Sequence, residues 1–278
     1  MKTKSNMNTK PQAEINMVLA AGAPETETKH GHKGFGSVSA ESGLCVGATS
    51  KPILFSAPMV KAILSGRKTQ TRRIVKAGFD CNEMEFYGLR DYDDRKVGLQ
   101  AFFVDESKMP LGVKCPYGKV GDTLWVRETW WKKPFLTRKD LKDGADTWPD
   151  FEYETEKIMA WEDSELKHYG WKKMPSIFMP REACRIKLTI TGIRVERLNS
   201  ITNEDAFKEG IDWKIKFPEE EPTTKFYRDY ERGENCFAHG ILFEARHSFF
   251  SLWKSINGRE SYNSNPFVWV IEFSKNGI

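Results

Sequence analysis

The sequence predicts an α+β domain built around a small mixed or antiparallel β-barrel with flanking helices. Three observations carry this prediction. Several segments have the β-branched and aromatic content of strands, the helical segments between them are short, and pairs such as Gly-Asp and Asn-Pro mark turns. The chain has 278 residues, of which 39% are hydrophobic and 13% aromatic, so it can bury a substantial core.

The first fifty residues differ from the rest of the chain in composition. They contain a single aromatic residue, Phe35, and are rich in Gly, Ser, Thr and Ala. A segment of this kind gains too little from burial to offset the entropy that it loses on ordering. We therefore predict a disordered tail over residues 1–50 and a folded domain over residues 51–278.

The folded domain is expected to begin with a short strand and a short helix. Residues 52–55 are apolar, and Ala57–Leu64 carries apolar residues at helical spacing, with Gly66 placed to end the helix. Residues 77–114 have a mixed composition, with one strand candidate at 102–104. We expect an insertion in this region.

The next strand is predicted at Thr123–Trp130, after a Gly-Asp turn. Its β-branched and aromatic residues favour a strand, which places Leu124, Val126 and Glu128 on one face. Residues 132–173 are charged and aromatic but show no clean period. They predict a second insertion.

The rest of the chain predicts three more strands and two helices. The strands are expected at 177–179, 185–198 and 267–273, and the helices at Asn203–Glu209 and Ile241–Ile256. Thr202 and Asp205 approximate a capping box at the start of the first helix, and Gly210 follows its end. The residues that the second helix should bury are Leu242, Phe249, Leu252, Trp253 and Ile256.

Charge and cysteine content exclude several classes of protein. The 43 basic and 39 acidic residues give a net charge of +4, too small to indicate a nucleic-acid partner by itself. No apolar run approaches the ~20 residues that span a membrane, and no signal peptide is recognisable. No Cys-x-x-Cys pair exists among the cysteines, which are Cys45, Cys81, Cys115, Cys184 and Cys236. We predict a cytoplasmic protein with no membrane partner.

The densest basic run of the chain is Gly-Arg-Lys-Thr-Gln-Thr-Arg-Arg, at residues 66–73. It places Lys68 three residues before Thr71, and an amine beside a hydroxyl can act as base for a nucleophile. A lysine is a base near neutral pH only if burial or neighbouring cations lower its pKa. The cations available for this are Arg67, Arg72 and Arg73. A solvated basic loop or a phosphate-binding patch explains the same composition.

This run resembles the signature of the ASCH domain, a PUA-like β-barrel family with the motif Gly-x-Lys-x-x-Glu-x-Arg. Gly66, Lys68 and Arg73 match the motif, and Thr71 stands in place of its Glu. The resulting Lys-Thr-x-Thr-x-Arg pattern is similar to that of small bacterial N(4)-acetylcytidine amidohydrolases of the same superfamily. The resemblance implies catalytic roles for Lys68 and Thr71, and for Glu209 in a short helix after Leu-Asn-Ser-Ile-Thr.

The resemblance covers roughly half of the folded domain, namely residues 51–75, 115–130, 179–211 and the closing strand. Larger ASCH proteins of bacteriophages and prophages are similar in layout and in the stretches Lys-Pro-Ile-Leu-Phe-Ser-x-Pro-Met and Gly-Asp-x-Leu-Trp-Val-Arg-Glu-Thr-Trp. The resemblance implies a PUA-like fold that binds RNA or a modified nucleoside. For a phage-encoded chain it also implies the host cytoplasm.

The reaction implied by the resemblance is hydrolysis of an acetyl amide. Thr71 would attack the acetyl carbonyl, Lys68 would take the hydroxyl proton, and Glu209 would hold Lys68 or pass a proton to the leaving amine. Backbone N–H groups near Thr71 or the Arg73 guanidinium would stabilise the oxyanion. We expect no metal and no cofactor, because the five histidines are scattered and no Cys/His cluster has zinc spacing.

Substrate or RNA contacts are expected from the basic run and from one strand, namely from Gly66, Arg67, Arg72, Arg73, Glu128 and Trp130. Glu128 lies on an apolar strand face, where a carboxylate usually has a partner. A buried ion pair with Arg72 or Arg181 is an equal alternative. Trp130 and Trp131 are candidates for stacking on unpaired bases, although core packing explains most of the nine tryptophans.

The sequence is compatible with three functions. The leading hypothesis is an amidohydrolase that releases the acetyl group of N(4)-acetylcytidine. A non-catalytic RNA-binding module would use the same basic cleft without turnover. A phage-type ribonuclease or an interaction protein would use the second insertion to engage its partner.

Overall fold

A computed structural model gives the structure of the protein. It describes residues 49–92, 98–136, 149–155, 161–216, 224–233, 236–238 and 244–276. The predicted tail lies almost entirely outside these residues. The described part of the chain contains many strands and few helices, which confirms the α+β class. None of its helices is long and apolar enough to cross a membrane.

The central element is a mixed five-stranded sheet with the strand order β1-β6-β10-β14-β2. Its strands are β1 (Ser50–Leu54), β6 (Thr123–Arg127), β10 (Lys187–Arg197), β14 (Phe267–Lys275) and β2 (Gln70–Ile74). β1 runs parallel to β6, and the other neighbours are antiparallel. β1 and β2 form the two edges, so the described strands close no barrel.

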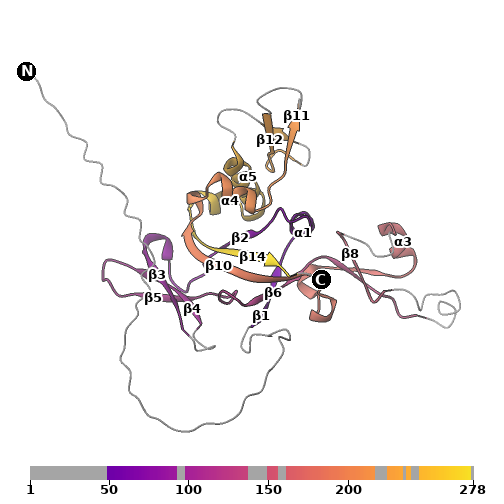
Figure 1. Cartoon of the computed structure of the whole chain (residues 1–278), viewed down its shortest axis with the longest axis horizontal. Helices are drawn as coiled ribbons and strands as arrows, with labels where there is room; N and C mark the ends of the chain where they lie inside the picture. Colours follow the sequence, from indigo (N-terminus) through magenta and orange to yellow (C-terminus); the bar gives the residue numbers. More distant parts are fainter. Residues whose placement is uncertain are drawn as a thin grey trace, which may run out of the picture. The chain divides into compact units, whose positions relative to one another are not determined.

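β14 explains how the sheet forms two cores, because its apolar run is buried on both faces. The odd-numbered residues from Phe267 to Phe273 pack into one cluster with side chains of β6 and β10. Val268 and Val270 face the opposite way and pack against Phe249 and Trp253. Figure 1 shows β10 and β14 side by side, with the helices that carry the second cluster on one side of them.

Three smaller sheets accompany the central one. The first contains β3 (Glu85–Asp91), β4 (Leu99–Val104) and β5 (Leu111–Lys114). The second contains β7 (Trp130–Lys132), β8 (Phe151–Tyr153) and β9 (Lys172–Met174), with helix α3 (Asp163–His168) between the last two. The third contains β11 (Trp213–Lys216), β12 (Thr224–Arg228) and β13 (Phe237–Ala238). The first two occupy the segments that we expect to be insertions.

The helices begin and end largely where their caps predict. α1 (Ala57–Leu64) has a proline in its first turn, and Gly66 follows its end with φ +74°. α4 (Asn203–Lys208) is capped by Thr202, whose hydroxyl accepts a hydrogen bond from Asp205 N (3.1 Å). α5 (Ala245–Asn257) and α6 (Arg259–Asn263) precede β14. Short 3₁₀ turns lie at Cys81–Glu83, Ser176–Phe178, Arg181–Ala183 and Leu198–Ser200.

Two predicted strands and one predicted core residue were wrong. The strand expected at Thr123–Trp130 is divided, because the chain leaves the central sheet after Arg127 and joins the β7–β9 sheet at Trp130. Residues 177–179 lie in and after a 3₁₀ turn, where nearby prolines supply no N–H. Ile177 and Phe178 are exposed, whereas Met179 is buried. Ile256, expected on the buried side of α5, is 57% exposed near the helix end. Leu242 lies outside the described residues.

Candidate active site

Lys68 lies in the loop between α1 and β2. The loop turns sharply at Gly66 and returns to the helix, where Lys68 N donates a hydrogen bond to Ala62 O (3.0 Å). The side chain is only 2% exposed. Its Nζ donates to the Oε2 atom and to the backbone oxygen of Glu209, both at 2.8 Å. The structure therefore brings two of the predicted catalytic residues into direct contact across 141 residues of sequence.

Glu209 reaches Lys68 because a glycine follows it. Gly210 has φ +80°, a left-handed conformation that favours glycine. A Cβ at this position would lie 2.8 Å from the Cβ of Lys68 and 3.0 Å from the Cβ of Ala62. The end of α4 can thus approach the α1–β2 loop only with a glycine here, and Gly210 is a positioning residue that the sequence indicated only as a helix end.

Burial lowers the pKa of the Lys68 ammonium from its ordinary value of 10.5, although the Glu209 carboxylate and its hydrogen bond oppose this effect. The positive charges of Arg73 and Arg72 lower it further. The predicted crowding by cations is therefore present for these two arginines. Arg67 takes no part in it, because its guanidinium binds Asp212 Oδ1 (3.1 Å) at the surface.

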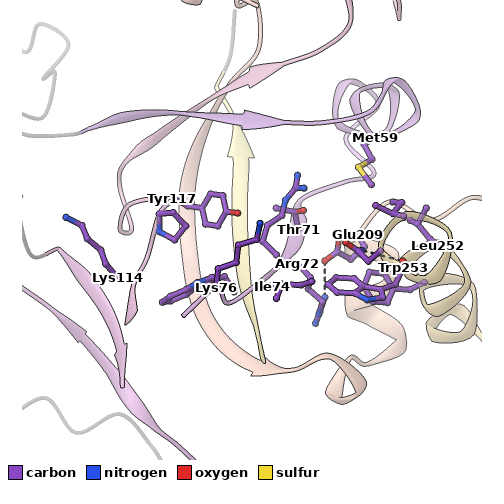
Figure 2. A pocket seen from close by; sticks show the side chains of 16 residues that line it. Met59, Thr71, Arg72, Ile74, Lys76, Lys114, Tyr117, Glu209, Leu252 and Trp253 are labelled. Atoms are coloured by element: carbon purple, nitrogen blue, oxygen red, sulfur yellow. Dashed lines mark hydrogen bonds and ion pairs between the residues drawn. The ribbon is translucent and has the colours of Figure 1, made fainter. Parts of the chain in front are cut away.

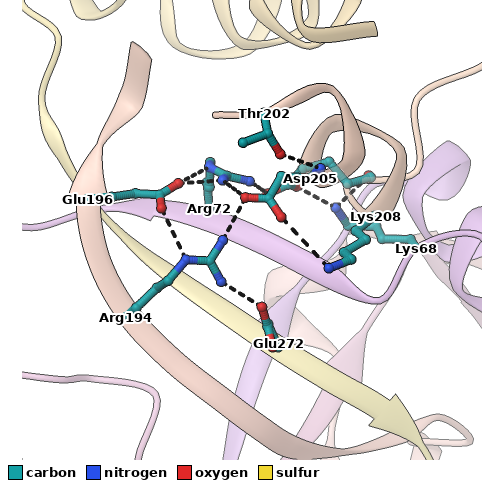
Figure 3. A network of polar contacts seen from close by, with 9 residues as sticks. Lys68, Arg72, Arg194, Glu196, Thr202, Asp205, Lys208 and Glu272 are labelled. Atoms are coloured by element: carbon teal, nitrogen blue, oxygen red, sulfur yellow. Dashed lines mark hydrogen bonds and ion pairs between the residues drawn. The ribbon is translucent and has the colours of Figure 1, made fainter. Parts of the chain in front are cut away.

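Arg72 is the centre of a buried polar network (Figure 3). Its guanidinium binds Glu209 Oε1 (3.1 Å), Asp205 Oδ2 (2.8 Å) and Glu196 Oε1. Arg194 extends the network by binding Asp205 (2.7 Å) and the further partners Glu196 and Glu272. Burial opposes ionisation of Asp205, yet the hydrogen bond from Arg72 and the charges of Arg194 and Arg72 leave its pKa below the ordinary value.

This network corrects the role predicted for Arg72. Its side chain is fully buried, and its guanidinium binds three carboxylates. The guanidinium is therefore not accessible to an RNA phosphate. Breaking these ion pairs would leave buried charges without partners, which is strongly unfavourable. Arg72 therefore holds Glu209 and α4 in place beside Lys68.

Thr71 is the third predicted catalytic residue, and it lies on the edge strand β2. It pairs with Ile271 of β14 while Arg72 pairs with Val270, so the side chains of Thr71 and Arg72 lie on opposite faces of the strand. Thr71 is buried, and its hydroxyl makes no hydrogen bond with any residue that the structure describes. It lines a cavity, as Glu209 does.

This cavity has a volume of about 550 Å³ and continues around the free edge of β2. It is lined by Met59, Thr71, Arg72, Arg73, Ile74, Lys76, Lys114, Pro116, Tyr117, Glu209, Phe249, Leu252, Trp253, Ile256, Asn257 and Trp269. Figure 2 shows Thr71 in its middle, with Tyr117 and Lys76 on one side and Glu209 and Trp253 on the other. Its size and mixed polar and aromatic lining are typical of small-molecule sites.

The backbone of β2 adds polar groups to the cavity. The main-chain hydrogen bonds of Thr69 and Val75 with β14, both 2.9 Å, show that odd-numbered residues of this segment face β14. The N–H and C=O groups of Arg72 and Ile74 therefore point toward the free edge. A planar ligand with its own donors and acceptors could bind such an edge as a neighbouring strand does.

Arg73 remains a binding candidate, because it lines the cavity. Its guanidinium donates to Leu54 O (2.6 Å) and lies 5.3 Å from the centre of the Phe55 ring. Gly66 contributes through the backbone turn that places Lys68. Sequence reasoning missed Lys76, which follows β2 in the chain. It also missed Tyr117 and the cavity side of α5, because those two segments meet β2 only in the folded chain.

Glu128 and Trp130 lie outside this cavity. Glu128 is 1% exposed and forms a buried ion pair, as one alternative predicted, but its partner is Arg185 (2.9 Å) and not Arg72 or Arg181. Trp130 is 4% exposed and packs in a cluster with Tyr153 and other apolar residues, and Trp131 is also buried. The stacking role predicted for these tryptophans is wrong, since neither ring is open to a base.

Comparisons with known proteins add no assignment. No protein family, curated protein or solved structure matches this chain. Within the described ranges, no group of three or more His, Cys, Asp or Glu side chains is placed to hold a metal ion. The resemblance to the ASCH family stays a prediction.

Proposed function

We propose that this protein is an ASCH-type domain of PUA-like fold that binds a modified cytidine and hydrolyses the acetyl amide of N(4)-acetylcytidine. The observation that carries the proposal is that Glu209, which binds the buried Lys68 amine, lines the same cavity as Thr71. Its members have the residue types that a lysine-assisted nucleophilic mechanism needs.

In this mechanism the Thr71 Oγ atom attacks the acetyl carbon, and its proton passes to the Lys68 amine, which accepts it in its neutral form. The carbon–nitrogen bond then breaks, and Lys68 returns the proton to the departing cytidine amine. Water hydrolyses the acetyl ester on Thr71, which releases acetate and restores the hydroxyl. Burial supports the neutral form of Lys68 by lowering its pKa, and Glu209 holds the amine in position.

The edge of β2 supports the same proposal. The N–H group of Arg72 follows Thr71 directly in the chain and points toward the free edge of the strand. A backbone donor in this place would bind the oxyanion that forms when Thr71 attacks a carbonyl. The Arg72 side chain meanwhile holds Glu209, so both parts of this residue serve the reaction in different ways.

The test is cytidine release from N(4)-acetylcytidine, followed by chromatography. Thr71→Val keeps the shape of the buried side chain and removes the hydroxyl, so we expect a loss of about 100-fold or more, while Thr71→Ser keeps measurable turnover. No described residue depends on the Thr71 hydroxyl for a hydrogen bond, so both variants should fold. Equal turnover by Thr71→Val and the native chain would refute the mechanism.

A non-catalytic binding module is the second candidate, and one observation favours it. The Lys68 Nζ atom already donates to two oxygens of Glu209, a geometry that also suits a purely structural ion pair. Lys68→Arg separates the two candidates, because arginine keeps the charge but cannot act as a base. Retained ligand binding with lost turnover supports the enzyme, and absent turnover in the native chain with binding intact supports the module.

A further inference from the structure

The charges around the cavity are unbalanced. Four cationic side chains line it, and Glu209 is the single carboxylate among its described lining residues. Both oxygens of that carboxylate are already bound, one by Lys68 and one by Arg72. No acidic group in the lining is therefore left to neutralise the other cations.

Two of the lining cations lack an acidic partner within the described part of the chain. Arg73 donates to a backbone oxygen only, and its Nε atom is buried without a hydrogen-bond partner. Lys76 is exposed and forms no ion pair with a described residue. Both line the same cavity as Thr71, and Arg73 lies two residues after Thr71, on the same face of β2. Such cations bind anionic groups, and phosphate most readily.

Tyr117 adds a neutral donor near these cations. Burial raises the pKa of its phenol, although the charge of Arg73 opposes this, so the hydroxyl stays protonated at neutral pH. In Figure 2 its ring lies on the same side of Thr71 as Lys76, and its hydroxyl points inward. A protonated phenol can donate a hydrogen bond to a phosphate oxygen.

The opposite side of the cavity has a different character. Phe249, Leu252 and Trp253 of α5 give it an apolar, aromatic wall. The cavity thus has a cationic side and an aromatic side, with Thr71 and the free edge of β2 between them (Figure 2). A ligand that fits has a planar ring at one end and a negative charge at the other.

We propose that the ligand of this cavity is a phosphorylated cytidine, with its phosphate at Arg73 and Lys76 and its base toward α5. This inference rests on the proposed use of the cavity for a cytidine derivative, and it assigns the substrate to nucleotides or RNA and not to the free nucleoside. The phosphate group is either a monoester, as in a mononucleotide, or a diester within an RNA chain.

Calorimetric titration of the full chain tests the proposal without any chemical step. The ligands are cytidine, cytidine 5′-monophosphate, cytidine 3′-monophosphate and a cytidine trinucleotide. We expect a phosphorylated ligand to bind about tenfold or more tightly than cytidine, the effect of one charge-assisted hydrogen bond. A preference for a mononucleotide indicates the monoester, and a preference for the trinucleotide indicates RNA.

Lys76→Gln supplies the matched comparison, because its exposed side chain can change without disturbing the core. It should weaken the phosphorylated ligand about tenfold and leave the affinity for cytidine unchanged. Lys61→Gln removes another exposed lysine that does not line the cavity, and it should change neither affinity.

Equal affinity for cytidine and all phosphorylated ligands, or no binding of any of them, would overturn the inference. A loss of affinity for every ligand in Lys76→Gln would also contradict it. These outcomes differ from a failure of the proposed reaction, because no ligand in the titration carries an acetyl group. An inactive protein that prefers phosphorylated cytidine would keep this inference and lose the amidohydrolase.

Discussion

Two buried carboxylates, Glu209 and Glu128, invite comparison because they have the same local chemistry and different surroundings. Glu209 binds Lys68 and Arg72, and Glu128 binds Arg185 and the Thr155 hydroxyl (2.8 Å). Both are at most 5% exposed. Burial and ion pairing therefore do not tell which of the two carboxylates belongs to a functional site.

Their surroundings separate them. Glu209 borders a cavity that also exposes a hydroxyl without a partner in the described structure and cations without acidic partners. Around Glu128 the groups bind one another, since Arg185 also donates to Thr155 (2.7 Å) and stacks on Tyr153 at 4.2 Å. A buried charge indicates a functional site when a cavity and reactive groups without partners lie beside it. It indicates a structural ion pair when all the groups around it bind one another.

The largest expected effect is on stability at the Glu209 centre. Glu209→Gln leaves Lys68 buried against a neutral amide, so we expect the free energy of unfolding in urea to fall by about 3–5 kcal/mol. The double variant Lys68→Met with Glu209→Gln removes both charges and should recover part of this loss. A fall of less than ~1 kcal/mol would mean that the pair is solvated and does not form the buried centre described above.

The same change at the other centre should cost less. Arg185 is partly exposed, so water can solvate it when Glu128→Gln removes its partner, and we expect a loss of about 1–3 kcal/mol. Cytidine release by this variant should equal that of the native chain under folding conditions. Reduced turnover by a stable Glu128→Gln variant would place this centre in the function and break the comparison.

Gly210→Ala tests how the Glu209 centre is assembled. The substitution strains a left-handed residue and forces a Cβ against Lys68 and Ala62. Gly121→Ala is the control, because Gly121 has φ +90° but nothing within 4 Å of the added Cβ. Gly210→Ala should destabilise the chain by roughly 1–2 kcal/mol more than the control, in a urea titration of both variants. Equal losses would show that the close approach is unimportant.

The smallest expected effect is on how the free energy of unfolding changes with pH. Because the pKa of Lys68 is lower in the folded protein than in the unfolded chain, the unfolded chain binds more protons between the two values. The free energy of unfolding should therefore gain a contribution that rises with pH and levels off near 10.5. Lys68→Met should lack this contribution in urea titrations over the alkaline range, and parallel curves would contradict the lowered pKa.

Much of the local structure could be predicted from the sequence, because local signals determine it. Gly66 marks the end of α1, Thr202 caps α4, and the apolar run at residues 267–273 predicts the strand β14. Periodicity is less informative near element ends. Ile256 has the spacing of a core residue, but it lies in the last turn of α5, where its side chain is exposed.

The site could be predicted only in part, for a related reason. A motif points to Lys68, Thr71 and Glu209, but a strand face shows only that Glu128 needs a partner, and the partner is Arg185. Tyr117 reaches the cavity from a separate segment with no pattern of its own. Ion-pair partners and cavities depend on contacts between segments that are distant in the sequence. Residue spacing along the chain does not predict such contacts.

The most direct measurement compares cytidine release from N(4)-acetylcytidine by the native chain, Thr71→Val and Glu128→Gln at equal folded concentration. Turnover by the native chain and by Glu128→Gln, with loss in Thr71→Val, is the result that the cavity beside Glu209 predicts. Equal rates in all three proteins, or a loss confined to Glu128→Gln, would contradict the assignment of the reaction to this cavity.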